Sequence, residues 1–289
     1  MNERADEAAA GMRPSLAAHN TPGGTPATVR AVDDATLARL EHENMTGWPD
    51  VFTGQVAGSL ARIDRGIGTY LTGLPAPFFN QIVVVDDEAT DDAMGAAVAT
   101  ARDRQARFCV VLRRGADDRF APVLADLGLV LDEHVMPGMA LHPIPSTIDQ
   151  TADGFDIRVV RDAAGLDDHV RVAAEGYGFA EWIARAVIGE ELWLRGGCAV
   201  YVGYDADAPV SAGFSVRTGR TLGIFTMATV PAARGHGHAS AMTARVVADG
   251  VAAGCDVAAL QASEMGRPIY ERLGFRLVQE YDIYVEQRT

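Results

Sequence analysis

The most informative segment of this 289-residue chain reads Met227-Ala228-Thr229-Val230-Pro231-Ala232-Ala233-Arg234-Gly235-His236-Gly237-His238-Ala239. It continues an apolar run that predicts a strand at 222–230, and it leads into a segment that predicts a helix at 238–253. Glycines in such a loop tolerate φ > 0 and let a ligand approach the backbone. The unpaired N–H groups of the first helical turn favour an anion at the same place. An ordinary strand–helix turn would also fit, so the segment alone leaves both interpretations open.

Two other phosphate-binding motifs do not match this loop. It lacks the Lys-Ser/Thr pair of a P-loop, and it lacks the three spaced glycines of a dinucleotide-binding fingerprint. The loop therefore favours neither a nucleotide-hydrolysing site nor a dinucleotide site.

Composition narrows the class of protein further. The net charge is -14 and no basic cluster is present, which disfavours a nucleic-acid partner. No apolar run approaches the ~20 residues that cross a bilayer, and the N-terminus lacks the apolar core of a signal peptide. We therefore expect a cytoplasmic protein without a membrane partner. The three cysteines are scattered and show no zinc-site spacing. We therefore expect each cysteine to be a small buried apolar residue, and we expect no bound metal.

A second motif lies one predicted helix and one predicted strand beyond the loop. It reads Tyr270-Glu271-Arg272-Leu273-Gly274-Phe275, with a tyrosine four residues before a Gly-Phe pair. Together the two segments resemble the GNAT superfamily of acetyl-CoA-dependent N-acetyltransferases. That family's loop has Arg or Gln, two residues, Gly, one residue, then Gly or Ala, and Arg234, Gly237 and Ala239 fill this pattern. The resemblance covers about residues 200–286 and implies a GNAT fold, a mixed α/β sheet.

The chain also contains a weak internal repeat. Residues 122–129 align with 268–275 so that Pro, Leu and Gly coincide. The order strand, helix, strand, helix, two closing strands is predicted in both halves, beginning at residue 82 in the first and 222 in the second. We therefore predict two tandem GNAT-like domains. The expected divisions are a disordered tail at 1–28, a degenerate domain at 29–142, a linker at 143–154 and a catalytic domain at 155–289.

The resemblance implies a role for each residue of the two motifs. Backbone groups left free for the pantetheine arm and the acyl carbonyl would be those of Met227, Ala228 and Thr229. Beside Arg234, the pyrophosphate would rest on the amides of Gly235, His236, Gly237, His238, Ala239 and Ser240. The side chains of the two histidines are expected to face solvent. Tyr270 would be the general acid that returns a proton to the CoA thiolate.

Two positions depart from the family pattern. Ser263 stands where the family often has an Asn that contacts CoA, and the strand at 222–230 lacks the glutamate that often serves as base. An alkylamine has a pKa of about 10, so it must lose a proton before it attacks. Glu264 is the nearest acid in the sequence and our candidate base. Glu175 and Glu181 lie in the predicted acceptor-side helices, and a proton shuttled by solvent is an equal alternative.

The acceptor is expected to lie against a helical region at 166–194. Its aromatic residues, which could line a pocket or pack in the core, are Tyr177, Phe179, Trp182 and Trp193. In the first half, acidic residues replace the glycine loop and Leu124 replaces Tyr270, so that copy is expected to have lost the CoA site. We expect it to complete the acceptor cleft or to stabilise the catalytic half, with the apolar segment 73–80 as a contact.

These features predict an acetyl-CoA-dependent N-acetyltransferase that acts on a primary amine of a small molecule by direct attack on the thioester. Acetyl-CoA is the expected cosubstrate, and the chain would be a monomer or homodimer. Two alternatives stay open. One is a non-catalytic acyl-CoA-binding or regulatory protein, and the other is an acyltransferase that uses a longer chain or acts on a protein N-terminus.

Overall fold

The structure is a computed structural model that describes residues 32–148, 152–189, 192 and 194–287. The elements of the first half are α1 (Asp34–Gly47), α2 (Pro49–Thr53), β1 (Leu60–Asp64), β2 (Ile67–Leu71), η1 (Pro77–Phe79), β3 (Asn80–Val84), α3 (Asp91–Asp103), β4 (Cys109–Arg113), η2 (Asp118–Phe120), α4 (Ala121–Asp126) and β5 (Leu129–Leu141). Those of the second half are β6 (Phe155–Val159), α5 (Ala163–Tyr177), α6 (Glu181–Val187), β7 (Cys198–Asp205), β8 (Ala208–Thr218), β9 (Thr221–Thr229), η3 (Pro231–Ala233), α7 (His238–Ala252), β10 (Val257–Gln261), α8 (Arg267–Arg272) and β11 (Arg276–Glu286). The predicted tail at 1–28 lies outside the described residues, as does part of the predicted linker.

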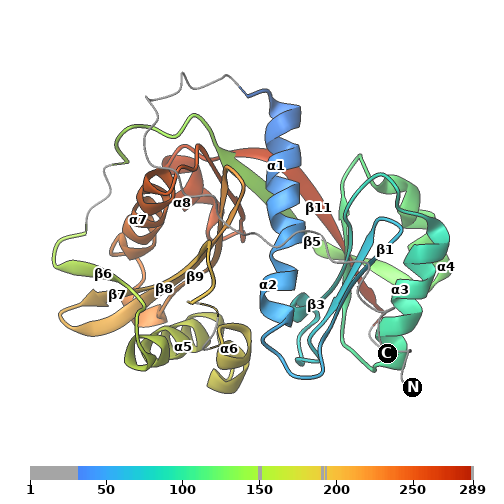
Figure 1. Ribbon diagram of the computed structural model, residues 1–289, viewed down its shortest axis with the longest axis horizontal. Coiled ribbons are helices and arrows are strands. Elements are labelled where there is room, and N and C mark those ends of the chain that lie inside the picture. Colours follow the sequence, from blue (N-terminus) through green and yellow to red (C-terminus); the bar gives the residue numbers. More distant parts are fainter. Residues whose placement is uncertain (1–31, 149–151, 190–191, 193, 288–289) are drawn as a thin grey trace, which may run out of the picture.

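These strands form one continuous mixed sheet of eleven strands in the described part of the chain. Their order is β1-β2-β3-β4-β11-β5-β10-β9-β8-β7-β6 (Figure 1). Only β3–β4 and β9–β10 pair in parallel, and the other pairs are antiparallel. No described helix is long and apolar enough to cross a membrane.

The two halves exchange their last strands at the centre of this sheet. β11 belongs to the second half, yet it lies between β4 and β5, two strands of the first half. β5 belongs to the first half, yet it lies between β11 and β10. The pair β5–β11 crosses the middle of the molecule (Figure 1). Each half therefore completes the sheet of the other, and the division at 143–154 does not separate two sheets.

The internal repeat is visible in the element order. The succession β3-α3-β4-α4-β5 recurs as β9-α7-β10-α8-β11. The predicted helices and inner strands are confirmed to within a few residues. The prediction of two closing strands per half is wrong, because β5 and β11 are each one long strand, and β11 carries register shifts near Leu277 and Asp282.

Helices cover both faces of the sheet. In the second half, Val200 and Val202 of β7 pack into the core with α5 and α6, whereas Tyr201 packs on the other face with α7. In the first half, α3 and α4 pack over β2, β3 and β4. Trp48, the C-cap residue of α1, and Val51 of α2 join the core of α5 and α6. The first half therefore supplies part of a core that belongs to the second.

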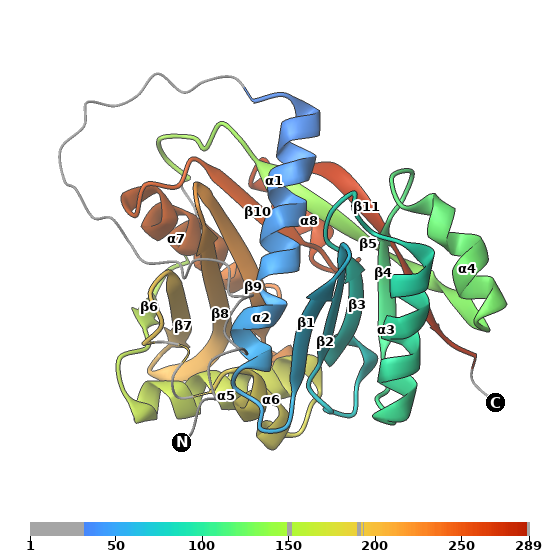
Figure 2. The same cartoon turned by 45° about the vertical axis from the view of Figure 1, so that its right-hand side comes forward.

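Helix α1 lies across the middle strands, between the two halves (Figures 1 and 2). Its buried face is unusually polar and carries Glu41, His42 and Asn44. Two glycines make room for this face. A Cβ on Gly138 would lie 2.7 Å from Glu41 Oε1, and a Cβ on Gly223 would lie 1.9 Å from Asn44 Oδ1. The helix therefore sits close to β5 and β9 only because these positions lack side chains.

Candidate active site

The site begins where β9 and β10 separate. Their parallel pairing runs from Thr221–Val257 to Ile224–Leu260, after which β9 continues to Thr229 paired only with β8. The separation coincides with a register shift opposite Gly213, where β9 has one extra residue, a β-bulge. Thr226 lies in this bulge with φ +48, a strained conformation for a β-branched residue. Strain of this kind is commonly concentrated at functional sites.

A cavity of 1530 Å³ opens at this separation. Both halves line it. The second half contributes residues from β9, the loop before α7, the end of β10, α8 and the helices α5 and α6. The first half contributes Trp48, Phe78, Phe79, Glu133, His134, Val135, Met136 and Pro137. The predicted contact segment 73–80 thus reaches the cavity through its two phenylalanines.

The glycine loop has the conformation that its sequence predicts. Gly235 and Gly237 both have φ +84, and Gly237 is the N-cap of α7. A Cβ built on either glycine would meet no atom within 4 Å, so positive φ, rather than crowding, explains their identity. All residues from Arg234 to Ser240 except His236 line the cavity. The first-turn N–H groups of α7 have no helical acceptor and can receive phosphate oxygens.

Two side chains of this loop lie differently from expectation. His238 was expected to face solvent, but this is wrong: it is buried, its ring stacks on Phe155 at 4.4 Å, and Nδ1 lies 3.2 Å from Ala233 O. Phe155 is in β6, far from the loop in sequence, so local pattern could not reveal this contact. His236 is exposed, as expected. The Arg234 guanidinium donates to Thr229 O and Gly176 O, and so ties the loop to α5.

The carbonyl groups of the three β9 residues assigned to the pantetheine already accept hydrogen bonds. Tyr177 Oη donates to Met227 O at 3.1 Å, and Ser211 Oγ donates to Ala228 O at 3.0 Å. Arg234 Nε donates to Thr229 O at 3.2 Å. The three carbonyls are therefore occupied, and the assignment of these backbone groups to CoA stays a prediction.

Two tyrosines approach each other across the cavity. Tyr270, on α8, packs edge-on against Phe275 at 5.9 Å, and burial raises its pKa to about 12. Its hydroxyl has no hydrogen bond to any described residue, so it is available to a ligand. Burial also raises the pKa of Tyr177, with a further contribution from Tyr270, although the residue as a whole is 47% exposed. The Tyr177 hydroxyl, which donates to Met227 O, therefore points inward while other atoms of the residue meet solvent.

The loop after β10 carries the remaining predicted residues. Ser263 Oγ accepts the N–H of Gly266 at 3.1 Å and so caps the turn before α8. Ser263 and the exposed Glu264 both line the cavity. Glu175 and Glu181, in the acceptor-side helices, are not among the lining residues. His134, on β5, also lines the cavity and was not predicted from the sequence. Its Nδ1 lies 2.7 Å from Asp132 Oδ1, and this hydrogen bond raises the pKa of His134.

Aromatic rings from both halves form the apolar wall of the cavity. Trp48 stacks on Phe225 with centroids 4.9 Å apart, and Phe79 meets Phe179 edge-on at 5.4 Å. Tyr177 stacks on Phe179 at 5.7 Å. Trp182 is 60% exposed and does not line the cavity, and Trp193 lies outside the described residues. Of the predicted aromatic residues that the structure describes, Tyr177 and Phe179 line the cavity, together with Trp48, Phe78 and Phe79 of the first half.

A buried polar group adjoins the cavity at the end of β10. Glu41 Oε1 accepts from Gln261 Nε2 at 2.6 Å, and its Oε2 accepts from Tyr281 Oη at 2.6 Å. Burial raises the pKa of Glu41 to about 7, against the lowering effect of these hydrogen bonds. His42 Nδ1 lies 3.2 Å from Tyr281 Oη, and burial lowers the pKa of His42 to about 4. Of these four residues, Gln261 lines the cavity.

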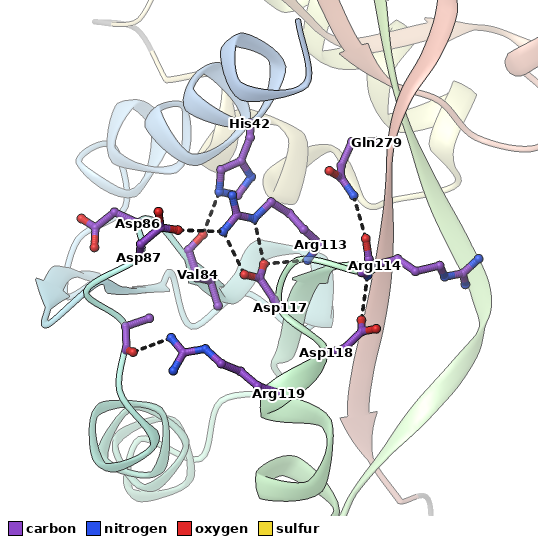
Figure 3. A network of polar contacts seen from close by, with 12 residues as sticks. His42, Val84, Asp86, Asp87, Arg113, Arg114, Asp117, Asp118, Arg119 and Gln279 are labelled. Atoms are coloured by element: carbon purple, nitrogen blue, oxygen red, sulfur yellow. Dashed lines mark hydrogen bonds and ion pairs between the residues drawn. The ribbon is translucent and has the colours of Figure 1, made fainter. Parts of the chain in front are cut away.

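The corresponding place in the first half is filled by protein side chains (Figure 3). At the end of β4, Arg113 forms two side-chain hydrogen bonds with Asp117, of 2.9 and 2.8 Å. His42 Nε2 lies 2.9 Å from Val84 O at the end of β3. The first turn of α3 carries two acidic residues, which disfavour an anion there. This arrangement supports the prediction that the first half lacks a CoA site.

Comparisons with known proteins agree with this geometry at the level of the fold. No protein-family model and no curated protein matches the chain. A GCN5-related N-acetyltransferase from Kribbella flavida is similar with a TM-score of 0.66 and 14% identity, over 86% of this chain and 96% of that one. One from Sphaerobacter thermophilus has a TM-score of 0.55 and 14% identity, over 88% and 93%. A tandem GNAT protein from the clavulanic acid biosynthesis pathway has a TM-score of 0.56 and 12% identity, over 87% and 94%.

These likenesses extend over nearly the whole of each chain. They show that the protein has the GNAT fold, with a tandem protein among its structural neighbours, as the two sequence motifs predicted. Among the residues described, no group of three or more His, Cys, Asp or Glu side chains could hold a metal ion.

Proposed function

We propose that this chain is an acetyl-CoA-dependent N-acetyltransferase that acetylates a primary amine of a small molecule. The observation that carries the proposal is the joining of a positive-φ glycine loop, separated strands β9 and β10, and an available tyrosine hydroxyl around one cavity. Aromatic rings of both halves form one wall of the cavity, which suits a small acceptor better than an extended polypeptide.

The residues present fit acetyl-CoA as substrate. The pyrophosphate would lie on the amides from Gly235 to Ser240, where open space surrounds both positive-φ glycines. The acyl end would lie between β9 and β10, near Thr226, whose buried hydroxyl oxygen has no hydrogen-bond partner among the described residues.

The proposed reaction is direct attack of the amine on the thioester carbonyl. The N–C bond forms, the C–S bond breaks, and the amine nitrogen gives up one proton while the thiolate gains one. In this proposal Tyr270 donates a hydrogen bond to the leaving thiolate. The proton leaves the amine through solvent or through Glu264, which lies at the exposed rim. Desolvation of the amine against the aromatic wall favours its neutral, reactive form.

A thiol-release assay tests the proposal. The full chain is mixed with acetyl-CoA and each member of a panel of primary amines, and free CoA is measured with a thiol reagent while the acetylated amine is identified by mass spectrometry. Amine-dependent thiol release with matching product supports the proposal. Acetyl-CoA binding without release across the panel would favour an acyl-CoA-binding or regulatory role. Release only with a peptide N-terminus would favour a protein acceptor.

A further inference from the structure

We propose that Gln261 binds the amino group of the acceptor through its side-chain carbonyl oxygen, and that the buried Glu41 is the positioning residue that turns this oxygen toward the cavity. This inference rests on the proposed function and identifies the contact that recognises an amine at the same site.

The orientation of Gln261 follows from the chemistry of its neighbour. Glu41 is 0% exposed, and both of its oxygens accept hydrogen bonds, one from Gln261 Nε2 and one from Tyr281 Oη. An ionised carboxylate can only accept, so the amide of Gln261 must present its NH₂ group to Glu41. The other end of the amide, Oε1, is then directed away from Glu41. It makes no hydrogen bond to any described residue.

Gln261 lies at the point where β9 and β10 part. It follows Leu260, the last β10 residue in register with β9, so its neighbour across the gap is Phe225. Both residues line the cavity, and Trp48 stacks on Phe225. Thr226, one residue further along β9, contributes the buried hydroxyl that lacks a partner in the described part of the chain. Gln261 Oε1 is therefore an unsatisfied acceptor beside the gap between the two strands, next to an aromatic wall.

An amine is the ligand that this arrangement suits. A neutral primary amine carries two N–H donors and one lone pair. One N–H donating to Gln261 Oε1 would hold the nitrogen so that its lone pair can reach the acyl carbon lying between the strands. Gln261 takes no proton, so it orients the amine without acting as the base. Because the amide oxygen is uncharged, it also does not favour the unreactive ammonium form as a carboxylate would.

The burial of Glu41 is costly for stability, which points to a role in the site. Replacing a buried charge by a well-packed apolar side chain is often neutral or stabilising, so an ionisable group held at 0% exposure calls for an explanation. Gly138 leaves room for the Glu41 carboxylate, because a Cβ at this position would lie 2.7 Å from Glu41 Oε1. Fixing the amide of Gln261 provides a function for this arrangement.

The proposal has a pH signature. The groups that face Glu41 are Gln261 from β10, Tyr281 from β11 and His42 on its own helix, while Arg113 and Asp117 act on His42 and Tyr281. The Glu41 pKa is raised to about 7, so the carboxylate is ionised above that pH and protonated below it. A protonated Glu41 can donate to Gln261 Oε1, which lets the amide reverse. Amine recognition should therefore weaken as the pH falls through about 7.

The test compares Glu41→Gln with Glu43→Gln in the full chain. Glu43 lies on the same helix, is about half exposed and pairs with Arg39, so it controls for the substitution itself. A glutamine at position 41 can donate to Gln261 and reverse its amide. For Glu41→Gln we expect the KM for the amine to rise about tenfold, the scale of a lost hydrogen bond, and the affinity for acetyl-CoA to stay unchanged. For Glu43→Gln we expect both values to equal those of the wild type. The ratio of variant to wild-type KM should be largest above pH 7 and approach one below it.

A second variant keeps the test decisive if Glu41→Gln does not fold. Gln261→Met preserves length and removes the oxygen, and we expect the same rise in amine KM without a change in acetyl-CoA affinity. Amine KM values within about twofold of wild type, or a KM ratio that is constant with pH, would overturn this inference while leaving the acetyltransferase proposal intact. Failure of the wild type to release thiol with any amine would instead refute the proposed function.

Discussion

Replacing Tyr270 by phenylalanine is expected to lower kcat while leaving the fold and acetyl-CoA binding intact. Burial raises the Tyr270 pKa to about 12, whereas a free thiol has a pKa of about 8.5. Complete proton transfer from Tyr270 to a thiolate would therefore be uphill by about 3.5 pKa units, or about 5 kcal/mol. Tyr270 should act mainly by donating a hydrogen bond to the developing thiolate. Loss of one such donor typically lowers kcat by about 100- to 1000-fold.

The assay is steady-state thiol release, with the KM for acetyl-CoA and the melting temperature measured in parallel. The Tyr270 hydroxyl bonds no described residue, so its removal should not lower the melting temperature. Tyr284→Phe, a change on β11 away from the lining residues, is the matched control. A loss of less than about threefold in kcat for Tyr270→Phe would remove this residue from the mechanism, given the size expected for a lost donor.

Three further predictions follow from the contacts that α1 and β5 make. Gly138→Ala should lower the free energy of unfolding by about 1–3 kcal/mol in chemical denaturation, because its Cβ would overlap the Glu41 carboxylate. Unchanged stability would mean that α1 lies farther from β5. Because folding raises the Glu41 pKa, the folded state binds more protons than the unfolded state between about pH 4.5 and 7, and this group's contribution to stability falls as the pH rises through that range. Glu41→Gln should therefore gain stability relative to the wild type over that range, by up to about 3 kcal/mol, and a pH-independent difference would contradict the pKa. Deleting residues 1–150 removes β5, which lies between β10 and β11 in the sheet. The remaining fragment should therefore be neither soluble nor active in expression tests. A soluble, active fragment would show that the second half folds alone.

The sequence was most informative where function restricts the backbone locally. Gly235 and Gly237 need positive φ, and this requirement is visible from residue type alone. Tyr270 and Gly274 lie one helix and one strand away, and that spacing survived into the structure. The conformation of the glycine loop, the order of elements in the second half and the repeat could therefore be predicted from a single chain.

Helix α1 could not be predicted because its buried face is polar. Glu41, His42 and Asn44 point at the sheet, so the apolar periodicity that reveals most surface helices is weak there. Glu41 accepts hydrogen bonds from Gln261 and Tyr281, His42 lies beside Tyr281, and Asn44 donates to Val216 O and Thr218 Oγ1. All of these partners lie more than 170 residues away in the sequence. Side-chain pairing over such separations leaves no local pattern.

The exchange of β5 and β11 was also beyond prediction from the sequence. Two closing strands were predicted in each half, whereas β5 and β11 are each one long strand that contains polar residues such as Glu133 and Glu280. In the structure both side chains line the cavity while the backbone stays in the sheet. Which strand pairs with which depends on contacts between the halves, and hydrophobic patterning within one strand does not encode its neighbour.

The central claim is that each chain binds one acetyl-CoA, at the loop before α7. Calorimetric titration of the full chain with acetyl-CoA tests this most directly when wild type is compared with Gly237→Asp. Aspartate tolerates the positive φ of Gly237 better than most residues, so the main change is a carboxylate beside the pyrophosphate. We predict one acetyl-CoA per wild-type chain and at least about tenfold weaker binding in the variant, the scale of one unfavourable charge contact. Two acetyl-CoA molecules per chain, or equal affinity in the variant, would contradict the claim.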